Sequence, residues 1–165
     1  MRRLTPIAIA VLLVMTAPIV ALSPAKGTLW YKSGARDFTV TLRFAYLVKG
    51  PDEIDPKVSI RRLILTSQDL EKSLRACQTL ACTTDGLTEG VSIDIDPGPQ
   101  MNYWMALGNG LVQHVDTEAL TALTATTNTP THLAGRIAFD STGKGGPKIE
   151  AEFDAPLLKT VTRAR

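Results

Sequence analysis

Residues 37–48 read DFTVTLRFAYLV, and this stretch decides the expected fold class. Apolar and polar side chains alternate along it. The apolar positions are Phe38, Val40, Leu42, Phe44 and Tyr46, and the polar positions between them are Asp37, Thr39, Thr41 and Arg43. Because successive side chains of a strand point to opposite faces, a period of two predicts a strand with one buried face and one solvated face.

Other segments carry similar patterns. VSIRRLILT (58–66) and GVSIDID (90–96) are expected to form half-buried antiparallel strands. MNYWMALGNGLVQHV carries Asn109-Gly110 between two apolar runs, which predicts a β-hairpin. THLAGRIAFD (131–140) and KIEAEFDAPL (148–157) flank the glycine-rich turn STGKGGP and predict a second hairpin.

One stretch has the period of a helix. In TSQDLEKSLRAC (66–77), apolar residues recur at i, i+4 and i+7 from Leu70 onward. Thr66 or Ser67 stands where a helix cap is expected. The pattern predicts one short helix, over about 67–78.

The remaining ambiguous segment is TEALTALTATT (117–127), which fits helix or strand, and its threonines favour strand. We therefore expect about seven or eight strands and one helix. This inventory predicts a mainly β fold, a single antiparallel β-sandwich that forms one domain over residues 26–165.

The first 25 residues have the parts of a secretory signal peptide. Arg2 and Arg3 precede an apolar run over 7–20, and small residues follow it, with cleavage expected after Ala25. An uncleaved signal anchor is the alternative, but the run is shorter than the roughly 20 residues that span a membrane. We expect a periplasmic or secreted bacterial protein without a stable membrane anchor.

The charge of the mature chain is balanced. Removal of residues 1–25 takes away two of the 18 basic residues and leaves 16, equal to the 16 acidic residues. This balance argues against nucleic acid or an anionic membrane as the partner. The expected partner is another envelope protein, and the oligomeric state stays open.

Cys77 and Cys82 are the only cysteines. In an oxidising compartment such a pair is usually a disulfide. Free thiols and a zinc site remain as less favoured alternatives, since a redox motif has two intervening residues and zinc needs about four ligands. A disulfide would also require the helix to end between the two cysteines, because five helical residues would hold the sulfurs too far apart.

Catalytic motifs are absent from the sequence: it has no glycine-rich nucleotide loop, nucleophile elbow, H-E-x-x-H helix or EF-hand spacing. We assign no catalytic, cofactor-binding or metal residue and expect no cofactor. Asp94 and Asp96 share one strand face and are compatible with calcium binding, but a solvated strand face is favoured since only two hard ligands are visible.

The segment MNYWM separates two sets of side chains. Met101, Tyr103 and Met105 are expected on one strand face and Trp104 on the other. Together with His114, the methionines are compatible with a copper site, although a role in the core is favoured. Trp104 would then be exposed and is the candidate partner contact.

The segments YLVKGPDEIDP (46–56), HLAGRIAFD (132–140) and EFDAPL (152–157), with a helix and nearby cysteines between them, resemble small exported bacterial β-sandwich proteins of uncharacterised function. The resemblance spans most of the mature chain. It implies an exported β-rich domain and carries over no functional residue.

Three hypotheses for function follow. The leading one is an exported, non-enzymatic envelope binding protein, such as an inhibitor or immunity-type factor, that uses an exposed sandwich face. The first alternative is a periplasmic carrier of a metal or small ligand, using Met101, Met105 and His114 or the carboxylates. The second is an enzyme with a dispersed site, in which His114 or His132 would carry the proton.

Overall fold

The computed structural model describes residues 24–96, 101–108, 110–116 and 122–165, with only the backbone at 101–102 and 110–116. Two short helices, α1 (Glu71–Ala76) and α2 (Leu80–Asp85), and a 3-10 turn, η2 (Thr142–Lys144), accompany the strands. The strands of the described part are β1 (Pro24–Ser33), β2 (Arg36–Pro51), β3 (Ser59–Thr66), β4 (Gly90–Asp94), β5 (Met101–Leu107), β6 (Gly110–Asp116), β7 (Leu123–Thr129), β8 (His132–Asp140) and β9 (Lys148–Thr160).

The prediction of a mainly β fold is confirmed. The described strands form one nine-stranded sheet in the order β6-β5-β4-β3-β2-β1-β9-β8-β7. All neighbours in this order are antiparallel, and the end of β2 makes an additional parallel pairing with β9. The strand count exceeds the predicted seven or eight by at least one because β1 adds to the strands read from the sequence.

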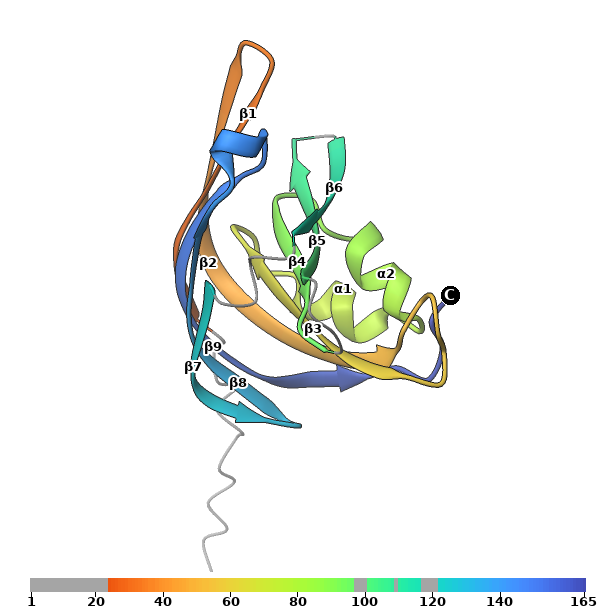
Figure 1. Ribbon diagram of the computed structural model, residues 1–165. Helices are drawn as coiled ribbons and strands as arrows, with labels where there is room; N and C mark the ends of the chain where they lie inside the picture. The colour runs from red at the N-terminus through yellow and green to blue at the C-terminus, as the bar shows by residue number, and fades with distance from the viewer. Residues whose placement is uncertain (1–23, 97–100, 109, 117–121) are drawn as a thin grey trace, which may run out of the picture.

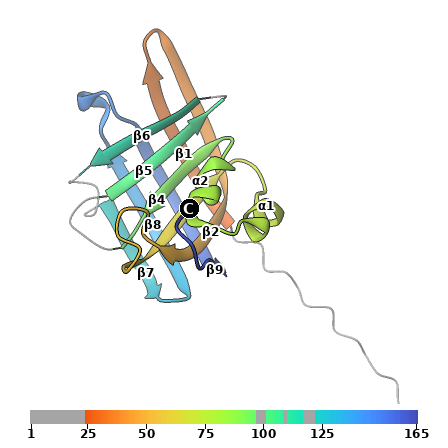
Figure 2. The same ribbon diagram turned by 90° about the vertical axis from the view of Figure 1, so that its right-hand side faces the viewer.

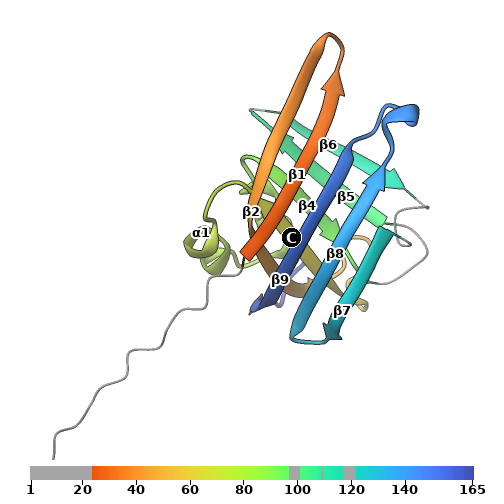
Figure 3. The same ribbon diagram turned by 90° about the vertical axis from the view of Figure 1, so that its left-hand side faces the viewer.

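The sheet folds over on itself, so the molecule has three layers. β7, β8, β9, β1 and the first part of β2 form the outer layer, which faces the viewer in Figure 3. β4, β5 and β6 run across this layer at a steep angle (Figure 2). The two helices lie on the far side of β3, β4 and β5 (Figure 1).

Two apolar clusters fill the spaces between the layers. The larger one joins the two halves of the sheet and includes Leu29, Leu65, Ile93, Met105 and Ile137, all fully buried. The smaller one lies under the helices. It contains Tyr46, Val48, Ile60, Ile64, Leu70, Leu74, Leu80, Leu87, Ala106 and Val161.

Strand β2 changes the face that it presents to the core. Val40 and Leu42 belong to the larger cluster, but Tyr46 belongs to the smaller one and Phe44 packs against it. The prediction that all four share a face is therefore wrong. The pairing of β2 with β1 is irregular at this point, because the step from Pro24 to Gly27 on β1 lies opposite the shorter step from Phe44 to Leu42 on β2.

The helical segment also differs from the prediction. The single helix expected over about 67–78 is two helices, and α1 begins after Leu70, its N-cap. Capping by Thr66 or Ser67 is wrong because Thr66 is the last residue of β3 and donates its hydroxyl hydrogen bond to the Glu89 carbonyl. The start of α1 is instead held by Asp69, whose Oδ1 accepts from Glu71 N at 2.9 Å.

Cys77 and Cys82 form a disulfide. α1 ends at Ala76 with Cys77 as its C-cap, and Cys82 lies in α2, so no single helix runs through both cysteines, as the predicted disulfide requires. Lys159 of β9 donates from Nζ to the carbonyls of Arg75 and Cys77, the first at 2.6 Å. A cation at the end of a helix satisfies free carbonyls there, so β9 and the disulfide fix the same point.

Both predicted hairpins are present. In the first, β5 pairs with β6 and Leu107 lies opposite Gly110, so residues 108 and 109 connect the strands, and residue 109 lies outside the described residues. In the second, β8 pairs with β9 along its whole length. The strand favoured for 117–127 corresponds in part to β7, although residues 117–121 lie outside the described residues.

Candidate functional site

Arg62 of β3 is fully buried, and among the described residues no other charged residue is. A guanidinium group has five N–H donors. Nε and Nη2 bind the two carboxylate oxygens of Asp94, at 2.7 and 3.1 Å. Nη2 also donates to Glu53 Oε1 at 3.2 Å, and Nη1 donates to the Leu80 carbonyl at 3.1 Å and to Thr84 Oγ1 at 2.8 Å. All five donors are therefore used.

Asp94 is the main counterion of this arginine. The register of the two antiparallel strands places it directly opposite Arg62. Burial raises the pKa of the Asp94 carboxyl, Arg62 acts against this rise, and the charges of Glu53 and Asp52 add to it. Desolvation thus outweighs the attraction of the arginine, and the neighbouring carboxylates make this region negative.

Trp104 of β5 packs against the guanidinium group of Arg62. The Arg62 Cζ atom lies 4.7 Å from the centroid of the indole ring, within the range of a cation–π contact. Trp104 is half-buried, whereas Tyr103 and Met105 are buried in the core, so the predicted opposite facing is confirmed for these residues. The expected exposure of Trp104 is wrong, because its ring packs against Arg62. The side chain of Met101 lies outside the described residues.

The loop that follows β2 carries an exposed isoleucine. Asp52 Oδ1 accepts hydrogen bonds from Ile54 N at 2.5 Å and from Asp55 N at 3.0 Å. Asp52 N donates to the Val58 carbonyl at 2.8 Å and closes the loop. Ile54 is 89% exposed and is the one large apolar residue that the described part of the chain exposes in this way. The turn therefore holds an apolar side chain in water.

A hollow of about 280 Å³ lies between this loop and the indole ring. Glu53 borders it and binds the buried Arg62 on one side, while on the other it lies 3.5 Å from Nε of Arg165. We call this site the Ile54–Trp104 surface. It consists of Asp52, Glu53, Ile54, Arg62, Asp94, Trp104 and Arg165.

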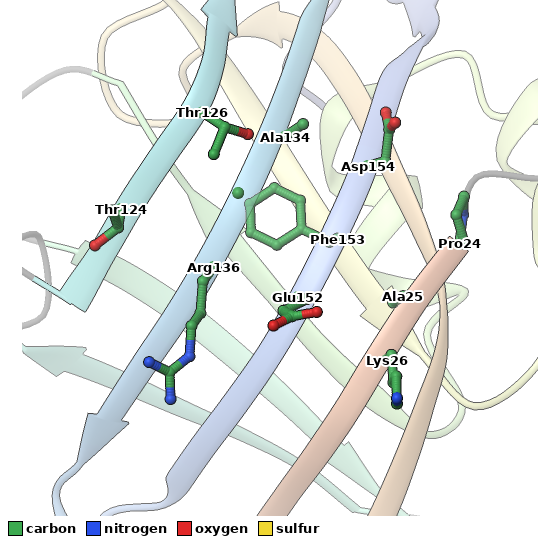
Figure 4. A pocket seen from close by; sticks show the side chains of 11 residues that line it. Pro24, Ala25, Lys26, Thr124, Thr126, Ala134, Arg136, Glu152, Phe153 and Asp154 are labelled. Carbon is green, nitrogen blue, oxygen red and sulfur yellow. The ribbon is translucent and has the colours of Figure 1, made fainter.

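A larger and more open groove of about 510 Å³ lies on the outer face of the sheet (Figure 4). Thr124 and Thr126 border it on β7, and Pro24, Ala25 and Lys26 border it on β1 (Figure 4). Two of its four charged residues are paired with neighbours. Arg136 pairs with Glu150, and Asp154 Oδ1 lies 2.5 Å from His132 Nε2. The ring of Phe153 lies between Ala134 and Arg136 in the same view, but it is only 5% exposed.

The acidic pair of the sequence does not form a solvated face. Asp94 binds Arg62, and Asp96 binds Arg61 through two hydrogen bonds of 2.5 and 2.9 Å. The favoured solvated face is therefore wrong, because each carboxylate is paired with an arginine of β3. The loop oxygens that a calcium site would need belong to residues 97–100, which lie outside the described residues.

The other candidate residues are dispersed. Met105 is fully buried, and the side chain of His114 lies outside the described residues. His132 lies on the outer layer with Asp154, far along the sheet order from β5. Within the described ranges, no three histidine, cysteine, aspartate or glutamate side chains form a group suited to a metal ion.

Sequence reasoning missed Arg62, Glu53 and Ile54. A usable signal was present in the pair Arg61-Arg62, which interrupts an apolar strand, and in the two acidic residues of the following strand. Neighbouring strands with opposite charges at matching positions favour cross-strand ion pairs. No comparable signal marks Ile54, because an isoleucine in a turn-rich loop does not show whether it is buried.

No family model matches the chain, and neither a curated protein nor a solved structure matches it. None of the helices in the described ranges is long and apolar enough to cross a membrane. The geometry of the site is therefore the basis for a functional proposal.

Proposed function

We propose that this chain is an exported, non-enzymatic binding protein of the bacterial envelope and that it contacts its partner through the Ile54–Trp104 surface. The observation that carries this proposal is the exposure of Ile54, 89%, on a turn closed by its own hydrogen bonds. Burial of such a side chain is favourable, by about 1.5–3 kcal/mol for full burial. Because the turn is already ordered, little entropy is lost when a partner covers it.

Two further features support the choice of this surface over the outer groove. Trp104 is half-buried beside the hollow, and tryptophan is enriched among residues that dominate binding energy. The groove in Figure 4 offers a ring that is nearly buried, and two of its charged side chains, Arg136 and Asp154, are already paired with neighbours. Its lining residues, all of them described, include no large apolar side chain that is as exposed as Ile54.

Export is supported by the disulfide, since such bonds persist in oxidising compartments. The signal peptide expected over 1–25 is part of this proposal, and residues 1–23 lie outside the described residues. The role proposed for the two cysteines is a structural disulfide that fixes the end of α1, with no redox chemistry.

Affinity capture from envelope extracts tests the proposal, with mass identification of the retained proteins. We expect a protein that wild type retains and that Ile54→Ser loses. Glu152→Gln, a substitution at an exposed residue of β9, should retain it equally. Because Ile54 is almost fully exposed, Ile54→Ser should leave the melting temperature unchanged.

Retention of the same proteins by Ile54→Ser and wild type would place the contact elsewhere and overturn the proposed surface. A copper(I) or calcium titration of the same protein addresses the carrier hypothesis. If either metal binds stoichiometrically and Ile54→Ser still captures every protein that wild type captures, the carrier hypothesis is favoured.

A further inference from the structure

We infer that the partner inserts a lysine or arginine side chain into the hollow of the Ile54–Trp104 surface, with apolar residues beside it that cover Ile54. This inference rests on the proposed function and names the chemistry of the partner.

The first argument is that the hollow is poorly suited to an anionic ligand, because Arg165 at its rim is the one cation there that could bind an anion. Arg62 is fully buried, and its five N–H groups are bound to Asp94, Glu53, Leu80 and Thr84. Arg165 is the remaining cation, and its side chain is 76% exposed with its Nε 3.5 Å from Glu53. An anion would therefore meet carboxylates and find only a solvated arginine to bind it.

The second argument is the excess of negative charge. Asp52, Glu53 and Asp94 face the two arginines of the hollow, so one carboxylate is left without a balancing cation. Asp52 and Asp94 have their oxygens engaged in the turn and with Arg62. Glu53 shares its two oxygens between the buried Arg62 and the exposed Arg165, and the second contact is the weaker one.

The third argument is the shape and lining of the site. Trp104 borders the hollow, and an indole ring attracts cations as well as alkyl chains. The volume of about 280 Å³ is below the range of about 300–1,000 Å³ usual for small-molecule pockets. A single long side chain from a protein matches it better than a free ligand does. Ile54 at the border supplies the apolar contact for the neighbours of that side chain.

Blocked pentapeptides test the inference: acetyl-Gly-Leu-X-Leu-Gly-amide with X as arginine, lysine, norleucine or glutamate. Binding to the full chain is followed by NMR through the Trp104 indole N–H and the Ile54 methyl groups, with Trp30→Phe used to assign the indole signals. We expect the arginine or lysine peptide to bind at least about ten-fold more tightly than the glutamate peptide. The difference should shrink as salt is raised from about 0.01 M to 1 M, because exposed charges are screened.

Three variants make the test specific to charge. Glu53→Gln should weaken the basic peptide by about three- to ten-fold, and Arg165→Gln should tighten it because it removes the competing cation from Glu53. Glu152→Gln removes one negative charge from the outer layer and should change nothing. A merely structural role for Arg165 would not produce tighter binding.

Each other outcome has a defined meaning. Equal binding of all four peptides at Trp104 and Ile54 would overturn the charge inference and leave the surface in place. Tighter binding of the glutamate peptide would also overturn it. If no peptide shifts these signals while envelope capture still depends on Ile54, the inference is wrong and the proposed function stands. If capture is also independent of Ile54, both are wrong.

Discussion

At the scale of single residues, two adjacent arginines have opposite fates. Arg61 reaches Asp96 and, through Nη1, the Thr129 carbonyl at 2.8 Å, and so ties β3 to the end of β7. Arg62 points the other way, toward α2 and Asp94. The sequence shows two charges in an apolar strand, and alternation shows that they face apart. Which one is buried depends on the helices that cover one face, and no local pattern contains that information.

Removal of Asp94 should destabilise the protein more than removal of an exposed partner does. We expect Asp94→Ala to lower the free energy of unfolding by about 3–5 kcal/mol, because it leaves Arg62 charged, buried and short of two hydrogen bonds. Glu71→Ala breaks the exposed pair with Arg75 and should cost about 0.5 kcal/mol. Urea unfolding measures both values, and equal costs for the two variants would contradict the view that Asp94 holds a buried charge.

The same residue predicts a dependence on pH. The folded-state pKa of Asp94 is raised, chiefly by burial, so the folded chain holds this proton more tightly than the unfolded chain does. The contribution of Asp94 to the free energy of unfolding is then fully present below the ordinary aspartate pKa of about 4. It is lost as the pH rises through the pKa that Asp94 has in the folded chain.

Relative to Asp94→Asn, which does not titrate, wild type should therefore have a larger advantage in unfolding free energy at about pH 3 than at about pH 7. Urea unfolding of both proteins at the two pH values gives this difference. An advantage that grows toward neutral pH would mean that Arg62 lowers the pKa of Asp94 more than burial raises it.

For helices and strands, local sequence signals predict the type of element well but predict poorly which of its faces is buried. The hairpin of β5 and β6 follows from turn residues and alternation, both of which are local. The change of face in β2 does not, because it depends on which layers cover the strand. One sequence feature marks the change: Ala45, Leu47 and Val48 end the alternation, and a continuous apolar run is typical of a strand buried on both faces.

The contribution of the disulfide between Cys77 and Cys82 to stability can be measured directly. Reduction should change the intact mass by two hydrogens, and Cys77→Ser should lower the free energy of unfolding by about 2 kcal/mol, since the bond closes only a short loop. Lys159 still binds the end of α1 in this variant, so the helix should persist in circular dichroism. Alkylation of both cysteines without reductant would show that the disulfide does not form.

At the scale of the whole molecule, the fold depends on contacts that are distant in sequence. β1 pairs with β9, and two glycines with positive φ, Gly90 and Gly135, sit where strands approach closely. A Cβ atom at Gly135 would lie 2.2 Å from the Thr124 carbonyl oxygen, and one at Gly90 would lie 2.2 Å from the Leu65 carbonyl oxygen. The sequence shows these glycines, but only the strand order explains why no side chain fits there.

The position of the N-terminal strand bears on processing. We expect protein recovered from the envelope to begin at Lys26, since Ala25 provides the small residue before the predicted cleavage site. Cleavage there removes Pro24 and Ala25 from β1, but the strand keeps the five register pairs with β9 that run from Lys26–Glu152 to Trp30–Lys148.

The retained pairs predict that loss of the first two residues of β1 is tolerated. Purified chains that start at Pro24 and at Lys26 should differ by less than about 1 kcal/mol in free energy of unfolding, because terminal residues of a strand contribute little. N-terminal sequencing of the exported protein and urea unfolding of the two chains check both statements. An exported chain that still begins at Met1, or a chain from Lys26 that fails to fold, would show that the segment before Lys26 belongs to the mature protein.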